Sequence, residues 1–231
     1  RRAALPEAYH RVVGELGAHH AAKRRLSSAG AGCPPMQVVL TGGPSGGKSS
    51  LAAHLAAALQ QRGVTVFVAP SVAALFLNCG CPRPDPEDAH GLLQFECAVL
   101  QLQLQLEASF QRIAAATGER VVVVYDRGVL DVAAFLPKAS RKEQWSALSE
   151  LVPQQQRPID YYRVIVHLVT AADGASFDEA RGGSRAAALE LDKSIHEVQN
   201  AHPNYLRVDN STNFDGKLRR ATDAVIAKLG L

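Results

Sequence analysis

A glycine-rich run is the part of the sequence best suited to chemistry. The stretch VVLTGGPSGGKSSLAAHL, residues 38–55, contains the spacing G-x-x-x-x-G-K-[ST] from Gly42 to Ser49. In such a loop the glycines let successive backbone N–H groups turn inward around phosphate oxygens, and the following helix directs its N-terminus at the same anion. Lys48 would place a positive charge on the β- and γ-phosphates, and the Ser49 hydroxyl would be a ligand to Mg²⁺. The pattern predicts binding of a nucleoside triphosphate, with a glycine-rich turn carrying an exposed lysine as the alternative.

An acidic residue follows the most apolar run of the chain. The segment RVVVVYDRG, residues 120–128, is typical of a parallel strand that is buried on both faces, and it ends at Asp126. An aspartate at this position can bind Mg²⁺ directly or through water. The alternative is an aspartate that caps the next helix. Arg127 could reach phosphate, or it could pair with Asp126 or Asp131.

Two further arginines lie in a polar, glycine-containing segment. Arg181 and Arg185 follow the fourth expected strand, where a lid over the site would lie. Arginines at such a place can stabilise charge on a transferring phosphoryl group. Solvated surface arginines are the equal alternative.

These residues need a framework of alternating strands and helices. Apolar runs at residues 37–40, 64–70, 121–126, 161–170 and 205–211 predict strands, and helical patterns separate them. Residues 87–117 include LQLQLQLE, which alternates like a strand. We expect a helix there, because Leu, Gln, Glu and Ala favour helices and β-branched residues are missing. The alternation predicts an α/β fold, a parallel β-sheet flanked by helices on both faces.

Composition limits the partners. The 231 residues carry a net charge of only +3, too balanced for a general nucleic-acid binder. No apolar stretch approaches the roughly 18 residues that a membrane span needs. The four cysteines lack the paired C-x-x-C spacing of a zinc site. We expect a soluble, cytoplasmic protein, with an organelle matrix or stroma left open.

The N-terminal segment differs from the rest. The stretch EAYHRVVGELGAHHAAKRR, residues 7–25, can form one amphipathic helix, so we expect an N-terminal helical extension at residues 1–35 before a nucleotide-binding domain at residues 36–231. The basic bias of this segment leaves open a remnant of a targeting sequence, but Glu7 and Glu15 favour an accessory helix. Such a helix could bind a protein partner.

Six segments together resemble a known family. LTGGPSGGKSSL, FVAPSVAALFLNCG, VVYDRGVLDVAAFL, VIVHLVTAADGASFDEAR, ALELDKSIHEVQNAHP and VDNSTNFDGKLRR occur in this order between Gln37 and Leu229. In order and spacing they resemble the AAA-type P-loop domain shared by the NadR ribosylnicotinamide kinase and the TRPL translocation defect protein. The resemblance implies a nucleoside-kinase-like fold that binds ATP or GTP with Mg²⁺.

The resemblance also implies roles for individual residues. Asp126 and Arg127 would face the metal and the phosphates, and Arg181 and Arg185 would be lid arginines. The turn Asp209, Asn210 and Ser211 would lie beside the nucleobase. The residues implied to hold the phosphates are Gly42, Gly43, Pro44, Ser45, Gly46, Gly47, Lys48, Ser49 and Ser50.

One position departs from the family pattern. The strand after the P-loop helix usually ends in Pro-Glu, and the glutamate points at the acceptor site, whereas this chain has Pro70-Ser71. A serine hydroxyl is a poor proton acceptor near neutral pH, and loss of a positioned base typically costs about 10²–10⁴ in rate. We therefore expect a Mg²⁺-dependent nucleotide-binding protein with NTPase potential. It would act either as an enzyme or as the nucleotide-binding subunit of a larger assembly. The alternative is a kinase acting on a nucleoside or a ribosylnicotinamide-like molecule.

Overall fold

The computed structural model describes residues 34–85, 87–173, 177 and 184–231. Residues 1–33 of the expected N-terminal extension and Arg181 lie outside these residues. The described strands are β1 (Met36–Thr41), β2 (Thr65–Ala69), β3 (Val121–Asp126), β4 (Val164–Leu168) and β5 (Tyr205–Val208). The helices are α2 (Lys48–Gln60), α3 (Val72–Asn78), α4 (Ala89–Ala116), α5 (Val129–Phe135), α6 (Arg141–Ser149), η1 (Gln154–Gln156), α7 (Pro158–Tyr161), η2 (Ala171–Asp173), α9 (Arg185–Gln199) and α10 (Phe214–Leu229).

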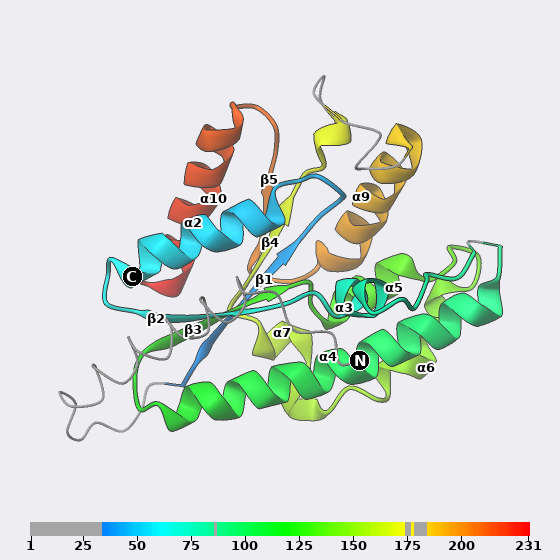
Figure 1. Ribbon diagram of the computed structural model, residues 1–231, viewed down its shortest axis with the longest axis horizontal. Helices are drawn as coiled ribbons and strands as arrows, with labels where there is room; N and C mark the ends of the chain where they lie inside the picture. The colour runs from blue at the N-terminus through cyan, green and yellow to red at the C-terminus, as the bar shows by residue number, and fades with distance from the viewer. Residues whose placement is uncertain (1–33, 86, 174–176, 178–183) are drawn as a thin grey trace, which may run out of the picture. The chain divides into compact units, whose positions relative to one another are not determined.

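The strands form one parallel sheet in the order β2-β3-β1-β4-β5. Strand β1 lies in the middle, between β3 and β4 (Figure 1). The chain therefore leaves β1 where the strand order reverses, and the carboxyl ends of its two neighbours meet there. This is where open α/β sheets bind ligands.

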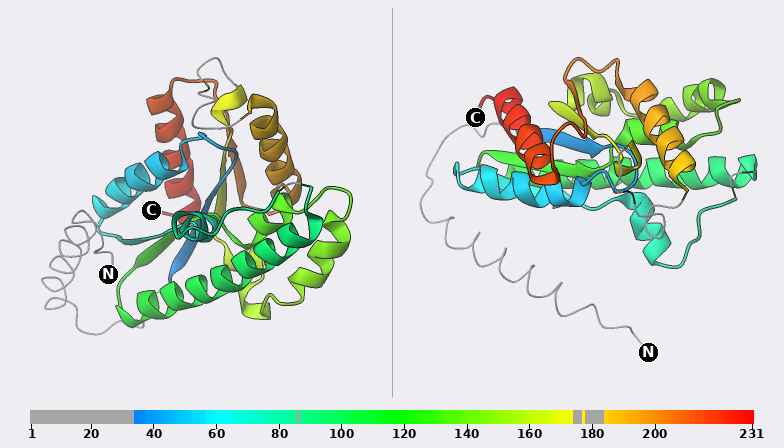
Figure 2. Two further views of the ribbon diagram at one scale, coloured as in Figure 1. Left: turned by 45° about the vertical axis from the view of Figure 1, so that its right-hand side comes forward. Right: turned by 90° about the horizontal axis from the view of Figure 1, so that it is seen from above.

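Both faces of the sheet are covered, as the apolar strands predict. Alternate side chains of β1 separate into two cores, with Val38 and Leu40 on one face and Val39 on the other. The first core contains buried leucines of α2 and the apolar face of α10. These two helices lie beside each other (Figures 1 and 2). The second contains residues of α4. The predicted fold class is confirmed.

The long segment with alternating Leu and Gln is a helix, as expected. Helix α4 spans Ala89–Ala116, and the Asp88 carboxylate caps its first turn by accepting from the Gly91 N–H at 2.8 Å. Leu100 and Leu104, four residues apart, face a core shared with α5 and α6. The favourable helix propensity of these residues thus agrees with their packing.

The beginning of the fourth strand differs from the prediction. Tyr161 ends the short helix α7, and β4 begins only at Val164. The reason is tertiary: the Tyr162 hydroxyl accepts from the Val129 N–H at 2.9 Å and donates to Glu107 at 2.8 Å. Tyr162 is therefore held in the second core and anchors the start of α5.

No helix among the described residues is long and apolar enough to cross a membrane.

Candidate functional site

The glycine-rich loop joins β1 to α2 at the carboxyl end of the sheet. Gly42 and Gly47 have φ angles of +116° and +98°, which side chains rarely adopt. A Cβ atom at Gly42 would lie 2.0 Å from the carbonyl oxygen of Leu168, at the end of β4. Glycine is thus required where the loop passes the neighbouring strand.

Five consecutive backbone N–H groups of this loop lack an acceptor. The amides from Gly46 to Ser50 make no hydrogen bond within the part of the chain that the structure describes, whereas the Leu51 N–H donates to the Gly47 carbonyl at 2.8 Å. Ser45 has a φ of +55°, so three residues of the loop, Gly42, Ser45 and Gly47, have positive φ before the helix begins. Unpaired amides at a helix N-terminus form an anion-binding cradle.

Lys48 lies across this loop. Its Nζ atom donates to the carbonyl oxygens of Gly43, at 2.9 Å, and Gly42, at 3.3 Å. Burial and, to a smaller extent, nearby Arg127 lower the pKa of Lys48 to about 7, although Asp126 opposes this shift. The ammonium group is therefore desolvated but poorly neutralised, and an incoming anion would stabilise its charged form.

Asp126 lies next to the loop, at the end of β3 and in register with Leu40 of β1. Its carboxylate makes no hydrogen bond or ion pair among the described residues. Burial raises its pKa, and the charges of Lys48 and Arg127 oppose that shift. The carboxylate is thus available to a cation or a water molecule.

The donor set suits a Mg²⁺ ion that shares a nucleotide. No group of three or more His, Cys, Asp or Glu that could hold a metal occurs among residues 34–85, 87–173, 177 and 184–231. Mg²⁺ is normally bound by one or two protein oxygens together with phosphates and waters. The exposed Ser49 hydroxyl and the Asp126 carboxylate fit that requirement.

Arg127 pairs with Asp131, which is one of the pairings that the sequence left open. Its Nη1 atom lies 2.9 Å from Asp131 Oδ1. Asp131 is buried and also accepts from the Thr41 hydroxyl at 2.5 Å and from the Gly128 N–H at 2.9 Å. Asp131 therefore ties the end of β1 to the turn after β3, and it holds the Arg127 guanidinium beside the site.

A carboxylate that the sequence analysis missed positions the loop. Asp192 of α9 accepts from the backbone N–H groups of Gly43, at 2.8 Å, and Thr170, at 3.0 Å, and it lies 3.1 Å from His167 Nε2. Burial alone would raise its pKa, but these hydrogen bonds lower it on balance. The buried residues of α9 are Ala188, Asp192, Ser194, Ile195 and Gln199, so a carboxylate at helical spacing from Ala188 and Ile195 was the available signal.

The turn Asp209 to Ser211 is held by its own side chains. Asp209 accepts from Ser211 and from Arg220, and these hydrogen bonds lower its pKa to about 2. Asn210 donates to the Thr170 carbonyl at 2.9 Å and accepts from the buried Lys217 at 2.8 Å. The side chains of Asp209 and Asn210 therefore hold the backbone of this turn through hydrogen bonds within the protein.

Phe214, three residues after this turn, lies against the glycine-rich loop. A Cβ atom at Gly47 would come within 2.8 Å of its ring. The residue is 50% exposed, although it begins α10. An exposed aromatic ring beside a phosphate-binding loop was not singled out from the sequence.

Comparison with known protein families matches residues 37–217 to the family described as AAA domain. The match covers most of the chain. The chain belongs to the AAA domain family.

Solved structures agree on the fold of this AAA domain. A crystal structure of NadR protein in complex with NAD and AMP-PNP has 14% sequence identity and a TM-score of 0.59. A structure of NadR protein in complex with NR has 13% identity and a TM-score of 0.60. Each alignment covers 86% of this chain and 50% of the NadR chain, so this chain spans about half the length of those proteins. No curated protein matches the sequence. The chain thus contains a P-loop nucleotide-binding domain with a kinase-like fold.

Of the two expected lid arginines, the structure describes one. Arg185 is the first residue of α9 in the AAA domain, and its Nη1 atom donates to the Ala172 carbonyl at 2.7 Å. Its guanidinium carbon lies 5.7 Å from the ring centre of Phe177. Arg185 and Asp192 are thus on the same helix, one at its start and the other against the phosphate loop.

Ser71 caps a helix beside a small cavity. Its hydroxyl accepts from the Ala74 N–H at 3.3 Å, at the start of α3. The cavity has a volume of about 20 Å³, and Ser71, Arg83, Glu96, Gln103, Arg127 and Asp131 contribute its polar lining. Glu96 and Arg83 were not identified from the sequence, because nothing in the helical pattern of α4 or in the proline-rich connection before it marks them.

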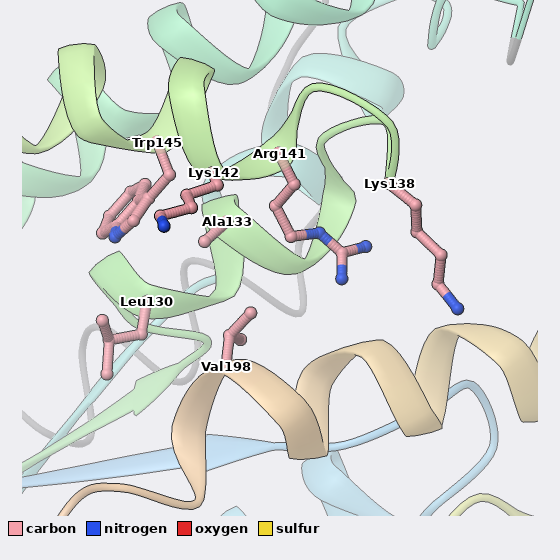
Figure 3. A pocket seen from close by; sticks show the side chains of 7 residues that line it. All are labelled: Leu130, Ala133, Lys138, Arg141, Lys142, Trp145 and Val198. Atoms are coloured by element: carbon pink, nitrogen blue, oxygen red, sulfur yellow. The ribbon is translucent and has the colours of Figure 1, made fainter.

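A larger cavity lies apart from the phosphate loop. Its volume is about 360 Å³, and its lining comes from α5, α6 and α9 with the residues between α5 and α6 (Figure 3). Lys138 pairs with Glu190, and Arg141 donates to the Ala134 carbonyl at 3.1 Å. These contacts join α6 and its preceding loop to the rest of the domain, and none of the proposed phosphate-binding residues lines this cavity.

We predict that Asp192→Ala destabilises the domain and weakens nucleotide binding. Loss of the carboxylate leaves the N–H groups of Gly43 and Thr170 without acceptors, at a cost of about 1–3 kcal/mol each. Denaturant unfolding measures the stability. Glu197→Ala, which removes a largely exposed carboxylate from the same helix, is the control and should change the unfolding free energy by less than about 0.5 kcal/mol. Equal effects of both variants would contradict the role of Asp192.

Proposed function

We propose that this domain binds ATP or GTP with Mg²⁺ and has NTPase activity. The observation that carries the proposal is the row of five unpaired N–H groups from Gly46 to Ser50, with Lys48 lying across the same loop. A polyphosphate supplies the acceptors that these groups lack and the negative charge that Lys48 needs.

The proposed roles follow from position. Gly42 to Ser50 bind the phosphates, and Ser49 and Asp126 hold Mg²⁺ directly or through water. When bound, Mg²⁺ neutralises charge on the β- and γ-phosphates. Arg127, held by Asp131, and Arg185, at the start of α9, are proposed to stabilise the charge that develops during transfer. Arg181 is proposed to act with them, on the resemblance to the family.

Transfer to a small molecule is the second candidate function. The cavity lined by Ser71 and Arg127 favours this function. Arg127 lies close enough to Lys48 to affect the pKa of Lys48, so the cavity adjoins the proposed phosphate site. The NadR structures, which contain AMP-PNP or NR, support a kinase that acts on a nucleoside-like alcohol. The nucleobase is proposed to lie near Asp209 to Ser211 and the exposed Phe214 ring. The ring lies against Gly47 of the loop, and Asn210 donates to the carbonyl of Thr170, whose hydroxyl donates to the Pro44 carbonyl of the loop.

We also propose a division of the chain. Residues 1–35 would be an extension that binds a protein partner, and residues 36–231 the nucleotide-binding domain. If transfer proves absent while nucleotide binding persists, the domain would act as the nucleotide-holding subunit of a larger assembly.

Lys48→Ala should abolish the stabilisation that nucleotide gives. A ligand that binds only the native state at 100 times its Kd stabilises it by about 2.7 kcal/mol, which raises Tm by several degrees. Thermal unfolding with and without Mg²⁺-ATP or Mg²⁺-GTP measures this shift, and phosphate release measures hydrolysis. Lys228→Ala, at the exposed end of α10, is the control and should behave like the wild type. A wild-type protein whose Tm neither nucleotide raises would contradict the proposal.

Nucleotide binding should take up a proton above neutral pH. Because burial holds the pKa of Lys48 near 7, most of this group is neutral at pH 8, and the bound phosphates should restore its charge. Calorimetry in buffers of different ionisation enthalpy should show uptake of about one proton at pH 8 and little at pH 6.

The matched control for this titration is Lys48→Arg, because arginine stays protonated throughout. It retains Lys217, whose pKa burial lowers to about 8, so the difference between the two proteins isolates Lys48. Equal proton uptake in wild type and variant would contradict the role of Lys48.

A further inference from the structure

The small cavity beside Arg127 contains a buried carboxylate that the proposed nucleotide site does not use. Glu96 of α4 is 2% exposed. Its Oε1 atom accepts from Arg83 Nη2 at 2.8 Å, and its Oε2 atom has no hydrogen-bond partner among the described residues. One oxygen is therefore fixed, and the other retains its lone pairs for a ligand.

Two arginines border this carboxylate from opposite directions along the chain. Arg83, from the connection between α3 and α4, has its guanidinium carbon 4.4 Å from the ring centre of Phe135, and that of Arg127 is 5.1 Å from the same centre. Arg83 is the solvent-facing partner of the ion pair, with 35% of its side chain exposed against 3% for Glu96. The ring of Phe135 thus holds one arginine near Glu96 and the other near the phosphate loop.

Competing carboxylates are already engaged. Both oxygens of Asp131 accept hydrogen bonds, from Thr41, Arg127 and Gly128. Asp126 lies within the influence of Lys48, where Mg²⁺ is proposed to bind. Glu96 is therefore the cavity carboxylate with a free oxygen.

The cavity also lies where the family places its missing acid. Ser71, the residue that stands in place of the family's glutamate, lines the same cavity as Glu96. A volume of about 20 Å³ accommodates about one water molecule, or a single hydroxyl group. The polar lining supplies the several partners that such a group needs.

We propose that Glu96 is the general base for phosphoryl transfer, replacing from α4 the acid that is absent at position 71. This inference rests on the proposed function. The acceptor is a hydroxyl-bearing molecule: water in hydrolysis, or an alcohol whose hydroxyl enters the cavity. Glu96 takes the proton from the O–H group of the acceptor while the acceptor oxygen forms a bond to the γ-phosphorus. The bond from that phosphorus to the β–γ bridging oxygen breaks, and a nucleoside diphosphate leaves.

The electrostatics suit this role. Burial raises the pKa of Glu96 to about 7, although Arg83 and Arg127 lower it, and Asp131 adds to the rise. A base whose pKa is near the working pH transfers protons efficiently. The reaction rate should therefore fall as the pH drops below about 7, where Glu96 becomes protonated.

Glu96→Gln tests the assignment, since the amide oxygen can still accept from Arg83. Phosphate release from Mg²⁺-ATP measures transfer to water, and labelled phosphate transferred to ribosylnicotinamide measures transfer to an alcohol. With whichever acceptor, water or ribosylnicotinamide, the wild-type protein uses, we expect the rate of the variant to fall by a factor of about 10²–10⁴. Nucleotide affinity, measured by calorimetry, should change less than about twofold, and the acidic limb of the pH profile near 7 should disappear.

Glu107→Gln is the matched control. Glu107 is also a buried glutamate of α4, and burial likewise raises its pKa to about 7, but it does not line the cavity. The rate of phosphoryl transfer by the Glu107→Gln variant should stay within about threefold of the wild-type rate. Adding Ser71→Glu to Glu96→Gln returns a carboxylate to the cavity and should recover at least about tenfold of the lost rate.

The outcomes separate this inference from the proposed function. A wild-type protein that binds no nucleotide would overturn both. A protein that binds Mg²⁺-ATP and neither hydrolyses it nor transfers phosphate would overturn the role of Glu96 and the proposed NTPase activity, and it would leave nucleotide binding standing. The role of Glu96 alone is overturned if Glu96→Gln retains the wild-type rate, or if Glu107→Gln loses as much as Glu96→Gln does.

Discussion

The domain depends on backbone amides that stay unpaired at the start of α2. The first N–H groups of a helix have no acceptor within the helix, and here the surrounding structure holds five such groups in one row. Gly42 passes against the Leu168 carbonyl, and the Asp192 carboxylate binds the Gly43 N–H. These contacts use the neighbouring β4 and α9 to keep the loop open for an anion.

Helix α9 and the residues around Asp131 connect the loop to the arginines of the site. Asp192 lies seven residues after Arg185, so a displacement of α9 would move the loop anchor and that arginine together. On the other side, Asp131 connects Thr41 at the end of β1 with Arg127 at the end of β3. Arg127 in turn borders the cavity that contains Glu96. Polar contacts therefore join the phosphate loop to α9, which begins with Arg185, and to Arg127, the two arginines proposed to stabilise charge during transfer.

Much of this framework could be predicted from the sequence because it rests on local patterns. The glycine spacing, the apolar run ending at Asp126 and the helix propensity of α4 each report a nearby physical requirement. The positions of Asp192, Glu96 and Arg83 could not be predicted in this way, since their partners lie far along the chain or in an irregular connection. Arg127 illustrates the limit: the sequence allowed pairing with Asp126 or Asp131, and the fold selects Asp131.

The central claim, that the amides of this loop bind the phosphates of a nucleotide, can be measured at the amides themselves. Two-dimensional ¹H–¹⁵N NMR of the labelled protein, titrated with Mg²⁺-ATP or Mg²⁺-GTP, follows each N–H group. We expect large downfield proton shifts for residues 46–50, with smaller changes at Leu51, whose N–H is already bonded to the Gly47 carbonyl. Saturable shifts confined to other parts of the chain, with residues 46–50 unchanged, would contradict it.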